Sequence, residues 1–171
     1  MGKRSNFKRR KQAKYFTPPE AIKPLLPHLE KSCTYIEPCV GEGHIVKVFD
    51  NMIDWPRCYH QSDYELDATI VNYMKWFPAN SAQYFITNPP WTRQILHPII
   101  DNLSKQLPTW LLFDADWMHT KQAIPYLTKC KKIVSIGRIS WMQNGVSSLD
   151  NCCWYLFDIN NKQDIKFYGR T

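Results

Sequence analysis

The sequence predicts an α/β fold with an open, mostly parallel sheet, helices on both faces and an antiparallel hairpin at the C-terminal end. Short apolar segments alternate with helical patterns through most of the 171 residues. A glycine turn follows the first expected strand and leads into a helix, and an Asn-Gly pair separates the last two expected strands. Strands that alternate with helices are typical of parallel sheets, whereas a tight Asn-Gly turn indicates an antiparallel hairpin.

The charge divides the chain into a basic arm, residues 1–14, and a single neutral domain, residues 15–171. The arm has no acidic residue, whereas the domain holds 15 basic and 15 acidic residues. We expect the arm to be flexible and to contact nucleic acid, because clustered lysines and arginines bind phosphates. The alternative is a solvated tail that aids solubility. The basic residues of the arm are Lys3, Arg4, Lys8, Arg9, Arg10, Lys11 and Lys14.

The six cysteines and five histidines form no metal-binding pattern, and no C-x-x-C pair occurs, so we expect no metal. The adjacent Cys152 and Cys153 lie in an expected strand, where they would face opposite sides as small core residues. The charged N-terminus has no apolar run behind it, and no apolar segment reaches membrane-spanning length. These features predict a reducing, cytoplasmic setting (the host cytoplasm for a phage-encoded chain) and no membrane partner.

The first half of the domain begins with an expected helix. Thr17 is predicted to be its N-cap, with Pro18 at the first helical position and Glu20 completing a capping box. Pro24 and Pro27 make this helix irregular. The next expected elements are a strand, a helix and a strand, at residues 34–37, 44–51 and 58–62.

The second half continues the alternation. Residues 68–77 fit a helix, or a helix followed by a short edge strand. A helix after residue 91 is predicted from apolar residues at helical spacing, namely Ile95, Ile99, Ile100, Leu103 and Leu107. Another helix is expected at residues 120–129. The remaining strands are expected at residues 84–87, 109–113, 133–136, 138–142 and 152–159.

The segment Asn88-Pro89-Pro90-Trp91 stops an apolar strand abruptly. Each proline fixes its φ and lacks an N–H, so the turn is stiff. The side-chain oxygen of Asn88 and the carbonyl of Pro89 are suited to accept the two N–H groups of an exocyclic amine such as that of adenine. Trp91 is suited to stack on a base. The simpler alternative is a strand end with a proline turn and no chemistry.

A glycine loop and an acidic residue follow the first two strands. Gly41 and Gly43 allow positive φ and a close approach of backbone to a ligand. Asp63 lies 20 residues beyond Gly43, the spacing at which an acid meets the ribose of an adenosine-containing cofactor. Glu65 and Asp67 are the alternatives to Asp63. Ligands of open α/β sheets bind at the carboxyl ends of the strands, where all of these residues and the turn at 88–91 are expected.

Four segments resemble the Rossmann-like S-adenosylmethionine-dependent amino-methyltransferases, in the order of the gamma-type N6-adenine DNA methyltransferases. Tyr15-Phe16-Thr17-Pro18 resembles the N-terminal cofactor motif. Glu37-Pro38-Cys39-Val40-Gly41-Glu42-Gly43 resembles the E-P-x-x-G-x-G cofactor loop. Asp63 matches the acid after the second strand, and residues 88–91 resemble the (N/D)-P-P-(Y/F/W) catalytic tetrapeptide. The resemblance covers about residues 15–160.

This resemblance implies transfer of a methyl group from S-adenosylmethionine to the N6 amine of adenine in DNA. Glu37 would meet the amino group of the cofactor, the aromatic segment 15–17 would close over it, and Asp63 would bind its ribose. The implied cofactor-binding residues are Tyr15, Phe16, Thr17, Glu37, Pro38, Gly41, Gly43 and Asp63. The implied catalytic residues are Asn88, Pro89, Pro90 and Trp91.

The chain departs from the family pattern in two ways. Trp91 stands where Tyr or Phe is commoner, and the residues after 160 leave no room for a separate target-recognition domain. Reading of the target would then fall to the arm, to residues 143–150 or to a second subunit. The compact size is similar to that of solitary phage enzymes. The alternatives are methylation of RNA, methylation of a protein glutamine amide, which the basic arm disfavours, and a non-catalytic nucleic-acid-binding protein on the same scaffold.

Overall fold

The computed structural model describes residues 17–52, 56–62, 82–141 and 148–170. Within these residues, seven strands form one sheet in the order β2-β1-β3-β4-β6-β5-β7. Strands β2, β1, β3 and β4 are parallel, β6 is antiparallel to β4 and β5, and β7 is parallel to β5. The predicted fold class is therefore confirmed. The strands are β1 Thr34–Glu37, β2 Arg57–Gln61, β3 Tyr84–Thr87, β4 Thr109–Asp114, β5 Cys130–Arg138, β6 Asn151–Phe157 and β7 Lys166–Tyr168.

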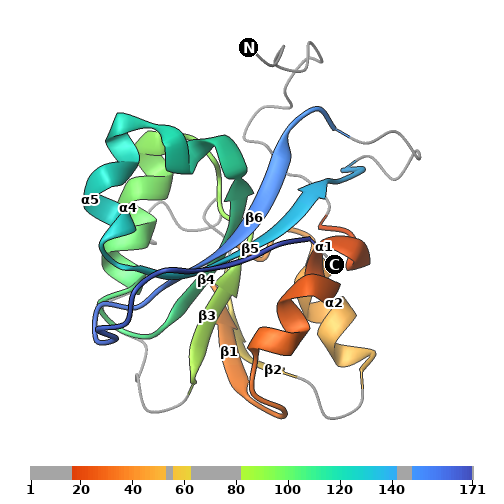
Figure 1. Ribbon diagram of the computed structural model, residues 1–171. Coiled ribbons are helices and arrows are strands. Elements are labelled where there is room, and N and C mark those ends of the chain that lie inside the picture. The colour runs from red at the N-terminus through yellow and green to blue at the C-terminus, as the bar shows by residue number, and fades with distance from the viewer. Residues whose placement is uncertain (1–16, 53–55, 63–81, 142–147, 171) are drawn as a thin grey trace.

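Helices cover both faces of the sheet, with α1 and α2 on one side and α4 and α5 on the other (Figure 1). One buried cluster lies under α1, η1 and α2, and a second lies under α4, η2 and α5. The helical elements are α1 Pro19–Ile22, η1 Lys23–His28, α2 His44–Asp50, α4 Arg93–Leu103, η2 Ala115–His119, η3 Lys121–Ala123 and α5 Ile124–Leu127, where η marks a 3-10 helix.

The strands β1 and β3, which precede the two predicted site loops, span the residues predicted for them. Helix α2 also begins at the predicted His44. The prediction for the two adjacent cysteines is confirmed, because Cys152 is buried in the first cluster and Cys153 in the second. Side chains of neighbouring strand residues point to opposite faces, so β6 contributes to both cores.

The N-terminal helix differs from the prediction at its start. Pro18, in an extended conformation, is the N-cap of α1, and no side chain caps the helix. Thr17 was predicted to be the cap, but its hydroxyl oxygen accepts a hydrogen bond from Asn88, which directly follows β3. After one turn the chain continues as the 3-10 helix η1, which contains Pro27. Prolines lack the N–H that an α-helix requires in its interior.

The predicted strands 133–136 and 138–142 are wrong as separate elements, because β5 runs continuously from Cys130 to Arg138. The pairing with β6 shifts register between Ser135 and Gly137, and Gly137 has φ +77°. This β-bulge lets one strand continue through Gly137, which lies between the two expected strands. The Asn144-Gly145 pair lies outside the described residues, as do residues 68–77.

The other differences are short. The helix expected at 120–129 is divided into η3 and α5, and Pro125 lies in the first turn of α5. Strand β6 ends at Phe157, where the Asp158 side chain accepts a hydrogen bond from the backbone N–H of Asn160 and forms a turn. Strand β7 was not predicted, because three residues give too short a pattern. In α4 the fully buried residues are Leu96, Ile99, Ile100 and Leu103, while Ile95 is partly buried and Leu107 lies beyond the helix.

Candidate active site

The carboxyl ends of the parallel strands meet at one edge of the sheet. β1 pairs with β3 and β3 pairs with β4, all in the same direction. Strand β1 ends at Glu37, β3 at Thr87 and β4 at Asp114, so the loops that follow these residues are neighbours. The predicted glycine loop and the predicted proline turn are therefore adjacent, as parallel pairing requires.

The glycine loop owes its glycines to backbone conformation. Gly41 has φ +52° and Gly43, the N-cap of α2, has φ +74°. A Cβ at Gly41 would meet nothing within 4 Å, so space is left open on that side of the loop. The left-handed conformation favours glycine at both positions. A loop with open backbone beside a helix N-terminus is a common way to hold a small ligand.

Hydrogen bonds tie this loop to the end of β2. The N–H of Val40 donates to the carbonyl of Ser62 at 2.8 Å, and the N–H of Ser62 donates to the carbonyl of Glu37 at 3.0 Å. Ser62 directly precedes the predicted ribose-binding Asp63, which lies outside the described residues. The loop after β1 and the end of β2 are thus held together.

Glu37 is the only buried charged residue in the part of the chain that the structure describes. Its side chain is 2% exposed, and the neighbouring Pro38 is also buried. Burial of a carboxylate is costly unless polar groups surround it. A buried acid at the carboxyl end of a core strand is therefore a candidate for binding a cationic group rather than for packing.

The proline turn places the Asn88 side chain between two polar groups. Asn88 is half-buried, its Nδ2 donates to the Thr17 hydroxyl oxygen at 3.1 Å, and its Oδ1 accepts from the indole Nε1 of Trp91 at 3.1 Å. Pro89 is buried and Pro90 is partly buried. Thr17 itself is 4% exposed. The structure therefore brings the predicted catalytic turn into contact with one residue of the predicted N-terminal cofactor motif.

Trp91 is packed as well as hydrogen-bonded. It is partly exposed and lies against both buried clusters. Its ring meets Trp141 edge-to-face, with centroids 5.6 Å apart and an interplanar angle of 79°. Trp141, which follows β5, is 7% exposed. Sequence reasoning missed Trp141, and the only available signal was a tryptophan beside a turn-rich segment.

Several predicted site residues lie outside the described part of the chain. They are Tyr15, Phe16, Asp63 with its alternatives Glu65 and Asp67, residues 143–147 of the expected reading loop, and the seven basic residues of the arm. Their roles stay predictions.

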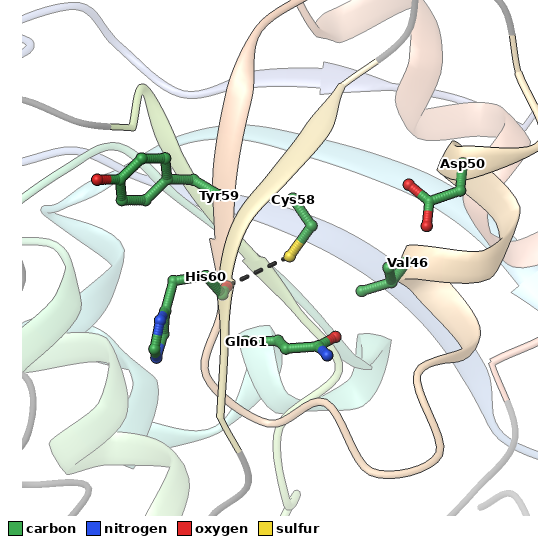
Figure 2. A pocket seen from close by; sticks show the side chains of 6 residues that line it. All are labelled: Val46, Asp50, Cys58, Tyr59, His60 and Gln61. Carbon is green, nitrogen blue, oxygen red and sulfur yellow. Dashed lines mark hydrogen bonds between the residues drawn. The ribbon is translucent and has the colours of Figure 1, made fainter.

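A surface hollow of about 350 Å³ lies elsewhere, between α2 and β2. Figure 2 shows Val46 and Asp50 of α2 facing Cys58 and Gln61 of β2, with Tyr59 and His60 completing the lining. The Cys58 thiol donates to the carbonyl of His60 at 3.3 Å, and burial raises its pKa to about 11. The thiol is therefore protonated at neutral pH and a poor nucleophile. Of the predicted site residues that the structure describes, none lines this hollow.

The described residues contain no group of three or more His, Cys, Asp and Glu residues arranged to hold a metal ion. No helix among them is long and apolar enough to cross a membrane.

Comparison with known proteins identifies the fold through structure alone. No protein-family model matches the chain, and no curated protein matches its sequence. A protein of Agrobacterium tumefaciens named as a predicted O-methyltransferase superposes with a TM-score of 0.52 and 10% identity, over 88% of this chain and 85% of that one. A sequence identity of 10% is too low to indicate more than a shared fold.

Two larger proteins also share the fold. The M protein of the type I restriction enzyme EcoKI gives a TM-score of 0.51 and 14% identity, over 92% of this chain and 48% of that one. A Listeria monocytogenes protein named as a class I S-adenosylmethionine-dependent methyltransferase gives 0.55 and 7% identity, over 88% of this chain and 62% of that one. The chain thus spans about half of the EcoKI protein and less than two thirds of the Listeria protein.

Proposed function

We propose that this chain is an S-adenosylmethionine-dependent methyltransferase that methylates the N6 amine of adenine in DNA. One observation carries the proposal. The Asn-Pro-Pro-Trp turn lies at the carboxyl end of β3, beside the positive-φ glycine loop, and its Asn88 amide is hydrogen-bonded to Thr17 of the N-terminal motif. The closeness of the turn, the glycine loop and Thr17 at one edge of a sheet that shares its fold with methyltransferases supports the proposal.

The residues at this edge fit the proposed cofactor. Gly41 and Gly43 leave backbone open to a ligand, and the buried carboxylate of Glu37 suits a cationic amino group. Pro38 fixes the start of the loop, and Thr17 lies across the sheet edge at Asn88. Tyr15 and Phe16 are proposed to cover the cofactor, and Asp63 is proposed to bind its ribose. When bound, the cofactor supplies an electrophilic methyl group, so the protein needs only to position the amine.

The proposed role of the turn is to hold the amine. A carboxamide oxygen has two lone pairs, so Asn88 Oδ1 can accept from the amine while it also accepts from Trp91. The carbonyl of Pro89 is the proposed second acceptor, because Pro89 lies beyond the end of β3 and outside its ladder. Preorganised acceptors of this kind contribute through electrostatics and orientation.

The choice of DNA rests on two supports. The chain carries seven basic residues in its first 14, and the EcoKI M protein is a DNA adenine methyltransferase. RNA is the closest alternative because the same charges bind either polymer. The N-terminal arm, the segment 143–150 or a second subunit is proposed to supply recognition of the target sequence.

The decisive experiment is transfer of a labelled methyl group to DNA, RNA and protein in parallel, followed by nucleoside analysis. We expect label in N6-methyladenine from DNA. Label in RNA or in a glutamine amide would mean that the substrate is RNA or a protein and not DNA. A chain that binds no S-adenosylmethionine in calorimetry would be a nucleic-acid-binding protein on this scaffold.

Deletion of residues 2–14 tests the proposed contact between the arm and nucleic acid. We expect weaker binding and a smaller dependence on salt, because each lost phosphate contact reduces the slope of log K against log salt by about one. Binding isotherms at several salt concentrations measure this slope. An unchanged slope would remove the arm from the binding surface.

A further inference from the structure

The Asn88 carboxamide lies between two hydrogen-bonding side chains, one from its own turn and one from the segment before α1. Thr17 accepts from its Nδ2, and Trp91 donates to its Oδ1, each at 3.1 Å. Trp91 is in turn held edge-to-face by the buried Trp141. The segment before α1 and the turn after β3 therefore meet at the Asn88 amide, and the segment after β5 contacts this amide's partner Trp91.

The chemistry of these partners allows one orientation of the amide. An asparagine side chain can rotate by 180° and exchange its oxygen and nitrogen, which differ little in size. The indole N–H is only a donor, so it can face Oδ1 but not Nδ2. A buried hydroxyl on the opposite side accepts from Nδ2. Rotation of the amide would place two donors against each other at Trp91.

We propose that Thr17 and Trp91 are positioning residues that hold the Asn88 oxygen in the orientation required by the target amine, and that Trp141 braces Trp91. The proposal rests on the function proposed above. It assigns the indole N–H of Trp91 a role that Tyr or Phe at this position could not reproduce with the same geometry, because a phenyl ring has no ring donor. It also links the N-terminal motif directly to the catalytic turn.

Two conservative substitutions remove one bond each. Trp91→Phe keeps an aromatic ring and removes the N–H, and Thr17→Val keeps the shape and removes the hydroxyl. Because one hydrogen bond is lost in each case, we expect kcat to fall about tenfold, with the affinity of Trp91→Phe for S-adenosylmethionine unchanged in calorimetry. Thr17→Ser restores the hydroxyl and is expected to recover the turnover lost in Thr17→Val.

Matched controls remove the same groups elsewhere. Thr109→Val deletes a buried hydroxyl that donates to the Leu107 carbonyl at the opposite end of the sheet. Trp117→Phe deletes an indole N–H that donates to His97. Both controls are expected to retain kcat. If they lose as much activity as the two site variants, the losses reflect general destabilisation, and the positioning roles are overturned.

The coupling between the two bonds gives a second test. We expect the double variant Thr17→Val with Trp91→Phe to lose less than the product of the single losses, because once one bond is gone the amide can already rotate. Independent, multiplicative losses would contradict a shared role in orienting the amide.

A spectroscopic measurement separates this proposal from the proposed function. In a sample labelled with ¹⁵N at tryptophan, the signal that disappears in Trp91→Phe is the Trp91 indole N–H. We expect Thr17→Val to shift this signal and to speed its exchange with solvent. An unchanged signal would overturn the proposed coupling of Thr17, Asn88 and Trp91 even if methyl transfer is found. If the wild type methylates nothing, the proposed function fails, and this signal alone then decides whether the three side chains are coupled.

Discussion

Two tryptophans follow the carboxyl ends of adjacent parallel strands and use their indole N–H in the same way. Trp91, after β3, donates to Asn88 Oδ1, and Trp117, after β4, donates to His97 Nε2, both at 3.1 Å. Trp117 is 4% exposed, whereas Trp91 is partly exposed. Trp117 is surrounded by further rings, those of Phe113, Tyr126, Tyr155 and Phe157.

The difference between the two hydrogen bonds lies in the acceptor atom. His97 Nε2 has a single lone pair, which the hydrogen bond from Trp117 uses. The His97 ring also packs on Tyr126, with the two ring centroids 4.3 Å apart. Asn88 Oδ1 keeps a second lone pair and belongs to a half-buried side chain. Both acceptor residues are half-buried, so the free lone pair distinguishes them and not their exposure. The Trp117 hydrogen bond leaves its acceptor with no further capacity, whereas the Trp91 hydrogen bond leaves Asn88 Oδ1 able to accept from a ligand.

The strongest test of the structural role of Trp117 is the Trp117→Ala variant. Removal of a large, nearly buried aromatic side chain typically costs about 3–5 kcal/mol of unfolding free energy. We expect Trp91→Ala to cost less, because that ring is partly exposed. Urea denaturation of both variants measures the difference, and equal losses would mean that the two tryptophans do the same structural work.

The strongest test of the proposed catalytic role of the Asn88 and Trp91 pair is the Asn88→Ala variant. We expect methyl transfer to fall about 100- to 1000-fold, as for other oriented hydrogen-bonding groups in active sites. Cofactor affinity should stay nearly intact, because Asn88 lies outside the glycine loop. Rates are measured with labelled cofactor and affinity by calorimetry. Turnover within a few fold of the wild type would remove Asn88 from the mechanism.

A smaller effect separates positioning from base stacking at Trp91. Stacking on an aromatic side chain contributes about 1–3 kcal/mol per base, and extrusion of a paired base costs a few kcal/mol. We expect Trp91→Ala to lose several-fold more activity on a duplex than on DNA whose target adenine is unpaired. The same comparison with Trp91→Phe should show no such difference. An equal loss of Trp91→Ala on both substrates would leave Trp91 with its positioning role alone.

The smallest expected effect is a pH dependence of stability that comes from His97, the acceptor of the Trp117 hydrogen bond. Burial, then the nearby Arg93, lowers the pKa of His97 below its ordinary value of 6.5, and Asp101 opposes this shift. A lowered pKa in the folded state means that the unfolded chain takes up the proton first. The contribution of neutral His97 to the free energy of unfolding is therefore complete above pH 6.5. It is lost as the pH falls through the pKa that His97 has in the folded state.

Thermal unfolding between pH 7.5 and 5 measures this dependence. We expect the midpoint of the wild type to fall more steeply than that of His97→Gln, whereas the exposed His119→Gln should follow the wild type. His28 and His44, whose pKa values are also lowered by burial, are present in all three proteins and cancel in the comparison. Parallel curves for wild type and His97→Gln would show that His97 is not the responsible group.

The sequence was sufficient for elements with strong local signals and insufficient for contacts across the sheet. Apolar β-branched and aromatic runs defined β1 and β3 to the residue, and parallel pairing then brought their loops together. The break expected near Gly137 was wrong, because a bulge absorbs the glycine without ending the strand. Thr17 has a side chain that can cap a helix or bond elsewhere, and only the folded chain decides between them.

Trp91 illustrates the same limit within the site. Its presence in the turn was readable, and so was its ability to stack on a base. Its hydrogen bond to Asn88 depends on the path of a four-residue turn, and its contact with Trp141 depends on a segment 50 positions further along the chain. Local sequence patterns carry no information about such pairs.

The position of β6 has a consequence for the order in which the protein folds. β6 lies between β4 and β5 and hydrogen-bonds to both, although it follows them in sequence. A nascent chain that has reached only residue 150 therefore has β4 and β5 without the strand that joins them. Until β6 emerges, the apolar edge of β4, with Trp110 to Phe113, has no partner among the described strands on that side. Such exposed edges attract other chains, so the interval before β6 is synthesised is the period when aggregation competes most with folding.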